Sequence, residues 1–358
     1  MMPFDANTVA ARALAYVDSL RAQGQPCGRY RYAASSATPV IYASAYAAMT
    51  LHLCGKADSL SRTDRRAWVE YLQSHQCDDG LFRQPELDNQ LADREDWWGW
   101  RHLTVHVFGA LAALGATAAK PLRLLEPLKK PGAIERWLDA QDWGERVAFT
   151  SNAVQNWGVM LQYARDFHHD ADAGRAMVEL LDGLDARQDA RSGLWGPLPE
   201  TPHARSQAVQ AAYHFFLLYF CDARPVRHVE RLIDHVLATQ NPAGGFGVNV
   251  PSSACEDIDS IDPLLRLGRL TDYRAGDVRA ALERALPWVL SNQNADGGFV
   301  FVRGQRFAYG HELMTTAADE SAAFPTWFRL LSLAYLAEGL GAPTAFAWLR
   351  CPGYQFAN

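Results

Sequence analysis

Two kinds of helical pattern alternate along the chain. In the first, apolar residues recur at three- and four-residue spacing with charged residues between them, which is typical of a helix with one buried face. This amphipathic pattern occurs at Asp64–His75, Pro131–Gln141, Ala173–Arg187, Val226–Thr239 and Asp277–Asn292. The second pattern is apolar nearly all round, which favours an inner position. It occurs at Ala37–Leu53, Trp100–Leu114, Ser151–Tyr163, Ser206–Phe220, Asp257–Leu270 and Ser321–Leu340.

A short phrase of glutamine, glycine and an aromatic residue separates each amphipathic run from the apolar run after it. Its copies begin at Gln23, Gln76, Gln188, Gln240 and Gln293, and Gln141 begins a degenerate sixth. The glycine can take a positive φ and end the first helix. The aromatic ring can pack over the junction, and the glutamine amide can bond backbone groups left open at a helix end. We therefore interpret the phrase as structural rather than catalytic.

The spacing of these phrases predicts six helical hairpins of roughly fifty residues each. A single hairpin cannot bury both of its faces, so neighbouring hairpins must stack. Six outer and six inner helices then close into an all-α (α/α)₆ toroid. Because the repeats run through the sequence, we expect residues 1–358 to form a single domain of this kind.

Composition and charge limit the binding partners and the cellular compartment that we expect for the protein. The chain has 358 residues, of which 49% are apolar, and a net charge of −6. No basic stripe is visible, so nucleic acid is not expected as a partner. The N-terminus lacks the pattern of a secretory signal, and no apolar run is long enough for a transmembrane segment. Six cysteines without CxxC pairs indicate reduced thiols, and we expect a cytoplasmic protein.

The repeated phrases resemble the Gln…Gly-x-Trp repeats of squalene–hopene cyclase-like triterpene cyclases. They also resemble the related repeats of protein prenyltransferase β subunits, and the resemblance spans nearly the whole chain. It implies a terpenoid-cyclase-like toroid with a pocket inside the ring, at the end where the inner helices begin. A homo-oligomer or a partner chain is compatible with it.

The opening of the fifth apolar run contains four carboxylates, Glu256, Asp257, Asp259 and Asp262. At helical spacing the first, third and fourth of these share one flank. The helix macrodipole favours one or two acids at such a position. Four crowded acids are harder to explain, and crowding with burial raises the pKa of at least one. A neutral carboxylic acid in a dry pocket can donate a proton.

The stretch Asp257-Ile-Asp259-Ser260 resembles the Asp-x-Asp-Asp motif of class II terpene cyclases, with the last position changed to serine. The resemblance implies that Asp259 is the acid that protonates an alkene or epoxide. It also implies that Asp257 and Glu256 are supporting carboxylates. Asp262, one turn further on, is an alternative for the changed position. Prenyltransferase zinc sites use an Asp-x-Cys pair and a later histidine, whereas this chain has the order reversed, so no metal site is expected.

The other openings supply candidate lining residues. In the sixth, His311 either orients the acid or is a solvated loop histidine, and Glu320 either matches Asp257 or Asp259 in repeat position or caps a helix. In the second, three tryptophans either wall an apolar cavity and stabilise carbocations or pack a loop. His102 there lies four residues before His106, but the context of a zinc pair is missing. The candidate substrate-binding residues are Trp97, Trp98, Trp100, His102, Asn156, Trp157, His203, Tyr213, Tyr309, Glu320, Phe324 and Trp327.

These observations predict a class II terpene cyclase-like enzyme that protonates an isoprenoid alkene or epoxide and so starts cyclisation or isomerisation. The expected substrate is a small hydrophobic isoprenoid. No cofactor is expected, except Mg²⁺ if the substrate carries a diphosphate. One alternative is a glycan-active (α/α)₆ hydrolase or lyase, because such enzymes also use toroids with carboxylates and tryptophan platforms. Another is a non-catalytic binding or scaffold toroid.

Overall fold

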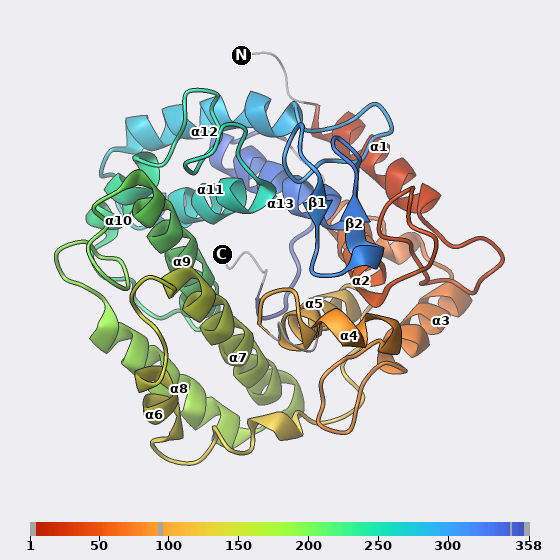
Figure 1. The fold of residues 1–358 in the computed structure, drawn as a ribbon, viewed down its shortest axis with the longest axis horizontal. Coiled ribbons are helices and arrows are strands. Elements are labelled where there is room, and N and C mark those ends of the chain that lie inside the picture. The colour runs from red at the N-terminus through yellow and green to blue at the C-terminus, as the bar shows by residue number, and fades with distance from the viewer. Residues whose placement is uncertain (1–4, 92–95, 344–345, 354–358) are drawn as a thin grey trace.

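The computed structural model describes residues 5–91, 96–343 and 346–353, and its helices form a ring (Figure 1). The outer helices are α1 (Ala6–Ser19), α3 (Arg62–Gln73), α6 (Ala133–Asp139), α8 (Ala171–Arg187), α10 (Val229–Leu237) and α12 (Ala275–Leu290). The inner helices are α2 (Ile41–Leu53), α5 (Trp100–Ala113), α7 (Val147–His168), α9 (Pro202–Cys221), α11 (Ala254–Gly268) and α13 (Ala323–Leu340). Shorter elements are α4 (Asp88–Leu91), the antiparallel pair β1 (Phe307–Ala308) and β2 (Thr315–Thr316), and the 3₁₀ turns Ala57–Ser59, Pro85–Leu87, Arg123–Leu125 and Glu312–Met314.

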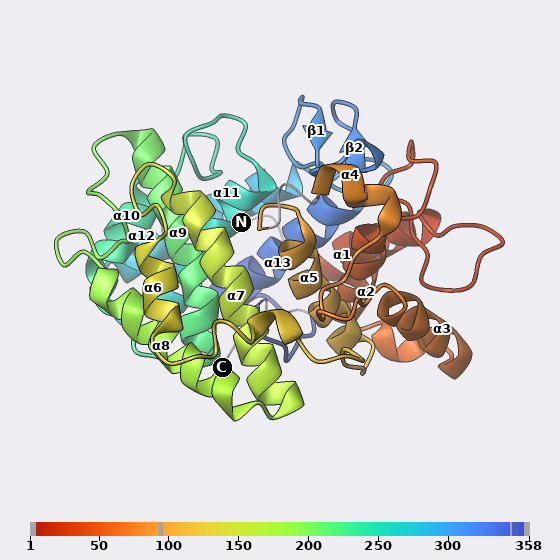
Figure 2. The same cartoon turned by 60° about the horizontal axis from the view of Figure 1, so that its bottom comes forward.

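The inner helices close on themselves. Each packs against the next in the order α2, α5, α7, α9, α11 and α13, and α13 packs back against α2. The outer helices lie around them, for example α8 on α7 (Figure 2) and α12 on α13 (Figure 1). The predicted all-α toroid of paired inner and outer helices is therefore confirmed.

Burial separates the two layers as the polarity of the sequence predicts. Every residue of α13 from Ala323 to Ala337 is buried, whereas α3 buries only Trp68 and Leu72. An inner helix is covered by neighbours on all sides, so apolar residues are favourable all round it. An outer helix needs only one apolar stripe.

The repeated glutamines tie each hairpin to the next. The side-chain amides of Gln76, Gln188, Gln240 and Gln293 each donate to the carbonyl of a glycine in their own loop. Each amide also donates to a backbone carbonyl of the following hairpin. For Gln293 that carbonyl belongs to Val9 of α1, so the last hairpin is bonded to the first. The structural interpretation of the phrase agrees with these contacts.

The aromatic residue of the phrase is anchored through its backbone. The N–H groups of Phe82 and Phe299 donate to the hydroxyls of Thr104 and Thr326, near the start of the next inner helix. In the fifth hairpin Phe246 N–H donates instead to the carboxylate of Asp257. Asp257 therefore plays the part in α11 that Thr104 plays in α5 and Thr326 plays in α13: its side chain accepts from the backbone of the aromatic residue. The equivalent in the sixth hairpin is Thr326, so the expected match of Glu320 to Asp257 is wrong.

The segment 346–353 covers the other end of the ring, where the inner helices finish. Ala347 N–H donates to the carbonyl of Leu53, the last residue of α2. The Trp348 ring stacks on Tyr335 of α13 at 5.0 Å between centroids. No helix in the described part of the chain is long and apolar enough to cross a bilayer.

Candidate active site

The four carboxylates of α11 have four different environments, which only the structure reveals. Glu256 belongs to a capping box. Its Oε2 accepts from Ser253 N–H at 2.9 Å, and Ser253 Oγ accepts from Glu256 N–H at 3.1 Å. Glu256 is therefore held at the helix N-terminus by backbone contacts of the kind that start helices.

Asp257 is saturated with hydrogen bonds. Its Oδ1 accepts from Phe246 N–H and from Ser252 Oγ, at 2.9 and 2.8 Å. Its Oδ2 accepts from Trp288 Nε1 of α12 at 2.9 Å and from Arg329 of α13 at 2.6 Å. Both charged side chains of the Asp257–Arg329 pair are fully buried. With both oxygens engaged, Asp257 joins three helices, and any contribution to chemistry is through the position of α11.

Arg329 completes this buried junction. Its remaining donors reach the backbone carbonyls of Val300, Ser252 and Phe301. A buried guanidinium needs such partners, because an ion moved out of water loses a large solvation energy. A lone arginine in the apolar run of α13 was a sequence signal for a buried carboxylate partner, and the sequence analysis missed it.

Asp262 is engaged in a second buried ion pair. Its Oδ1 accepts from Arg266 Nε, one turn along the same helix. Burial raises the pKa of Asp262, although the charge of Arg266 opposes that shift. The Arg266 guanidinium lies 5.1 Å from the ring centroid of Phe220 on α9 and contacts Tyr335 on α13. Asp262 thus has a partner that Asp259 lacks.

Asp259 has the environment of a proton donor. Its side chain is 3% exposed, and no hydrogen-bond partner for it is found among residues 5–91, 96–343 and 346–353. Burial raises the pKa of Asp259 well above its ordinary value, and the charges of Glu256, Asp262 and Asp257 raise it further. These effects favour the protonated form, with an O–H group that is not committed to a neighbour.

The direction of Asp259 follows from its helical register. Cys255, Asp259, Asp262 and Arg266 recur at four- and three-residue spacing and so share one stripe of α11. Arg266 reaches α9 on one side and α13 on the other. These are the two inner helices on either side of α11 (Figure 1). We conclude from these contacts that the stripe faces the axis of the ring, not the outer layer.

An aromatic cluster occupies the same end of the ring. Tyr309 contacts Phe324 at 4.6 Å and Trp98 at 5.3 Å between centroids. Tyr46 of α2 stacks on Trp327 at 5.3 Å. The structure therefore brings together four of the predicted lining residues, Trp98, Tyr309, Phe324 and Trp327, which come from two distant parts of the sequence.

His102 joins this cluster. Its Nδ1 lies 3.1 Å from the hydroxyl of Tyr42, on α2. Burial is the main cause that lowers the pKa of His102 well below its ordinary value, so the ring is held neutral. The structure finds no group of three His, Cys, Asp or Glu side chains placed to hold a metal ion among the residues it describes. The stretch Cys255-Glu256-Asp257 is the one that reverses the prenyltransferase Asp-x-Cys order. Its Asp257 has both oxygens occupied and does not fit a zinc site.

Other predicted lining residues belong to the seam between α5 and α7. Trp97 packs against Phe149 at 4.8 Å, near the surface. Asn156 donates to Asp96, which is paired with Arg101. The structure places the rest as follows: Trp100 is buried with its carbonyl bonded to Thr104, and Trp157 lies under the Arg101 guanidinium beside Trp137 of α6.

Four further residues predicted for the site lie in loops or in α9. His311 Nδ1 accepts from Leu313 N–H and caps a 3₁₀ turn, and burial lowers its pKa. Glu320 accepts from the backbone N–H groups of Ser35 and Ala317, which lie in loops, so it does not cap a helix as the sequence analysis allowed; α13 begins at Ala323 without a side-chain cap. His203 is exposed in the first turn of α9, and Tyr213 is buried further along that helix.

A serine–histidine pair on the inner helices was not expected. Ser151 Oγ of α7 lies 2.8 Å from Nδ1 of His214 on α9. Burial lowers the pKa of His214 to about 3. In the sequence His214 stands in an aromatic run of α9 and looks like an ordinary core residue. The pair became visible only when α7 and α9 were placed side by side.

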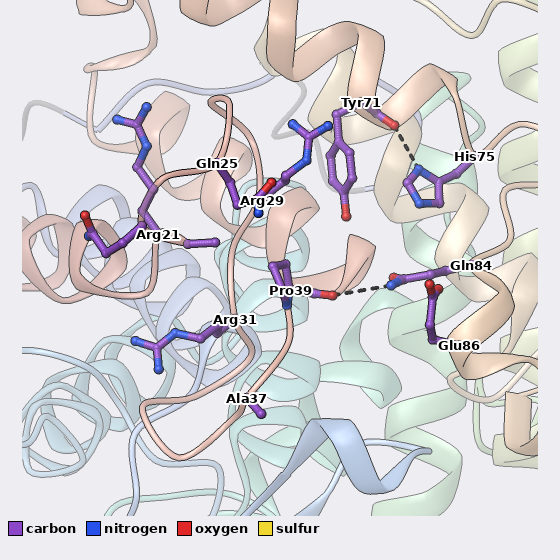
Figure 3. Close-up of a pocket in the computed structure, with 12 residues that line it drawn as sticks. Arg21, Gln25, Arg29, Arg31, Ala37, Pro39, Tyr71, His75, Gln84 and Glu86 are labelled. Atoms are coloured by element: carbon purple, nitrogen blue, oxygen red, sulfur yellow. Dashed lines mark hydrogen bonds between the residues drawn. The ribbon is translucent and has the colours of Figure 1, made fainter.

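A surface groove lies away from these residues. It has a volume of about 660 Å³, is formed by the first two hairpins, and includes Arg21, Arg29, Arg31, Tyr71 and Glu86 in its lining (Figure 3). The Arg29 guanidinium lies 4.6 Å from the ring centroid of Tyr71. None of the residues predicted for the site lines this groove.

The closed ring of paired inner and outer helices defines the class of all-α toroids. The family model of the prenyltransferase alpha-alpha toroid domain matches residues 5–95 and 201–342. The match covers more than half of the sequence, and the chain therefore belongs to this family. None of the curated proteins matches it.

Several solved structures are similar to this chain. A protein from Actinoplanes is 14% identical with a TM-score of 0.51, over 93% of this chain and all of that one (100%). A glycosyl hydrolase family 88 protein from Bacteroides vulgatus is 13% identical with a TM-score of 0.50, over 94% and 100%. The ent-copalyl diphosphate synthase from Streptomyces platensis is 18% identical with a TM-score of 0.45, over 85% of this chain and 51% of that one. At these identities the similarities concern the fold only.

Proposed function

We propose that this protein starts the cyclisation or isomerisation of a small isoprenoid by protonating it, with Asp259 as the acid. The observation that carries the proposal is a single one. Asp259 is a buried carboxyl group with a raised pKa and no described hydrogen-bond partner, on the stripe of α11 that faces the axis.

The chemistry needs an acid, a dry site and a way to stabilise positive charge. The Asp259 O–H would transfer its proton to a terminal alkene or epoxide, which leaves a carbocation on the substrate. Aromatic faces stabilise such a cation through cation–π contact, and Tyr309, Phe324 and Trp327 supply them. Burial keeps water from capturing the cation early.

The supporting residues act through position. The Asp257–Arg329 pair and the capping box of Glu256 fix the first turn of α11, and Asp259 lies in the next residues of that helix. Glu256 and Asp257 also place negative charge near Asp259, which favours its protonated form. If the substrate carries a diphosphate, Mg²⁺ is expected to accompany that group, whereas the proton transfer uses a side chain of the protein.

The glycan-active alternative has less support from the site. Glycoside hydrolysis by two carboxylates needs both of them free, at roughly 5–10 Å from each other. Here Glu256, Asp257 and Asp262 are occupied by a cap, four donors and an arginine. Tyr309, Phe324 and Trp327, at the same end of the ring as Asp259, are buried aromatic residues rather than the polar lining of a sugar-binding groove.

The test is a matched pair of amide substitutions. Asp259→Asn removes the proton, and Glu283→Gln makes the same chemical change at an exposed position of α12. Both variants and the wild type are incubated with polyprenyl substrates of C15–C30, and products are measured by gas chromatography and mass spectrometry. We expect Asp259→Asn to lose product formation by about 10²-fold or more, on the scale of general acid catalysis. Unchanged product formation by Asp259→Asn would rule out the assigned acid.

A further inference from the structure

We infer that His214 is the base that removes a proton from the cationic intermediate and so ends the proposed reaction. The inner helix α9 would then supply the base and its neighbour α11 the acid. This inference rests on the proposed function and adds a second catalytic residue to it, which the sequence analysis did not identify.

The hydrogen bonds of Ser151 assign the tautomer of His214. Ser151 Oγ donates its only proton to the carbonyl of Ala148 at 2.7 Å. The 2.8 Å contact between Ser151 Oγ and His214 Nδ1 must then be made with Nδ1–H as the donor. Nε2 therefore carries the lone pair. It has no partner within the described ranges, and the side chain is only partly buried although α9 is an inner helix.

The register of α9 and α11 places His214 at nearly the same height as Asp259, with the His214 side chain turned toward Ser151 of α7. The two helices pack against each other, and Arg266 of α11 lies over the ring of Phe220 of α9. Both inner helices begin at the same end of the ring, since each follows an outer helix and a loop there (Figure 1). Six residues back from Phe220 is His214, and seven back from Arg266 is Asp259. At ~1.5 Å per residue these positions differ in height by about one residue.

His214 also faces the axis. Its charge would act on His102 of α5, which lies in the aromatic cluster on the other side of α7. Gln210, one turn before His214, is likewise partly exposed among buried neighbours of α9. The acid of α11, the base of α9 and the aromatic cluster therefore lie at the same end of the ring, where the inner helices begin.

The two steps balance without any co-reactant. First the O–H bond of Asp259 breaks, and the proton forms a C–H bond with one carbon of the alkene, which leaves a cation and a carboxylate. After ring closure or rearrangement, a C–H bond next to the cationic carbon breaks. Its proton goes to Nε2 of His214, and its electron pair forms a new double bond. Transfer of the proton from the imidazolium to Asp259 restores both groups, so the net reaction is an isomerisation.

The environments of Asp259 and His214 favour different protonation states, which suit an acid and a base. Burial raises the pKa of Asp259 and lowers that of His214, so the proton resides on the acid before substrate binds. A weakly basic imidazole is sufficient in the second step, because a carbocation is a far stronger acid than an imidazolium. A more basic histidine would take the proton from Asp259 before the substrate could.

The test follows product identity rather than rate alone. His214→Ala and His214→Gln are compared with the wild type on the polyprenyl substrates, in H₂O and in D₂O. We expect substrate consumption to stay within about tenfold, while the wild-type alkene falls and alcohols or isomeric alkenes replace it. Deuterium should still enter at the initiating carbon, since Asp259 is intact. An unchanged product spectrum in both variants overturns the inference.

The outcomes of these assays, with one further measurement, separate this inference from the proposed function. If the wild type consumes no substrate, or Asp259→Asn consumes it normally, the proposed function fails and the inference fails with it. If Asp259→Asn is inactive and the His214 variants give wild-type products, only the inference fails. ¹⁵N NMR of the folded wild type at pH 7 should show the His214 proton on Nδ1 and none on Nε2. The opposite tautomer overturns the assignment without any assay of activity.

Discussion

The environment of Asp259 predicts an unusual effect on stability. Asp259→Asn keeps the shape of the side chain and removes its ability to ionise. The folded-state pKa of Asp259 is raised well above 3.8, the value of an unperturbed aspartate. Above pH 3.8 the unfolded chain has released this proton while the folded protein still holds it. Stability from this group is therefore full below the unfolded pKa and is lost as pH rises toward the folded pKa.

The magnitude follows from proton linkage. One proton held only by the folded state lowers the free energy of unfolding by about 1.4 kcal/mol for each pH unit within that window. Asparagine cannot ionise and escapes this loss. The variant should therefore become more stable than the wild type by ~1.4 kcal/mol more with each pH unit, starting above the ordinary carboxyl pKa. The proposed catalytic acid is thus expected to cost stability at neutral pH.

Urea unfolding of both proteins at pH 5, 6 and 7 measures this difference. The other ionisable groups are shared by the two proteins, so their pH dependence cancels when the two free energies are subtracted. A difference that stays constant over this range would contradict the raised pKa and, with it, the assignment of a protonated Asp259. Asp257→Asn is the matched control, two residues away in the same helix. It leaves the buried guanidinium of Arg329 without its charge partner, and we expect a loss of about 3–5 kcal/mol.

Other contacts make further predictions. Arg329→Met should lower the free energy of unfolding by roughly 3–5 kcal/mol in urea, because it strands the Asp257 carboxylate; a loss below 1 kcal/mol would argue against the buried pair. Gly297→Ala should prevent normal closure of the ring, since its φ is +93° and a Cβ would lie 2.2 Å from the carbonyl oxygen of Arg12 in α1. Gly304→Ala is its control, with φ of +75° and no atom within 4 Å, and should cost only the ~1–2 kcal/mol of a left-handed alanine in thermal unfolding. Equal losses for the two glycine variants would show that the Gly297 contact with α1 is unimportant.

The sequence by itself determined the architecture of this protein. The periodicity of apolar residues distinguishes outer from inner helices. The number of glutamine phrases gives the number of hairpins, because each hairpin packs on its neighbour through the same kind of turn. The residue that closes the ring is also recognisable in the sequence, since Gln293 belongs to the same repeated series as Gln76. In the structure Gln293 is bonded to α1 as Gln76 is bonded to the hairpin after it. The sequence also singled out Asp259 as one of four crowded acids.

Only the tertiary structure decided what each of those acids does. Asp257 is bonded to Arg329, which lies 72 residues later, and no spacing rule within a helix could reveal that partner. The same holds for Ser151 and His214, which are 63 residues apart and meet because α7 and α9 are neighbours in the ring. Burial and hydrogen bonding set the pKa of a side chain, and both depend on residues brought together by folding. The elements of the fold are therefore readable from local pattern, whereas the chemistry of the site depends on contacts between hairpins.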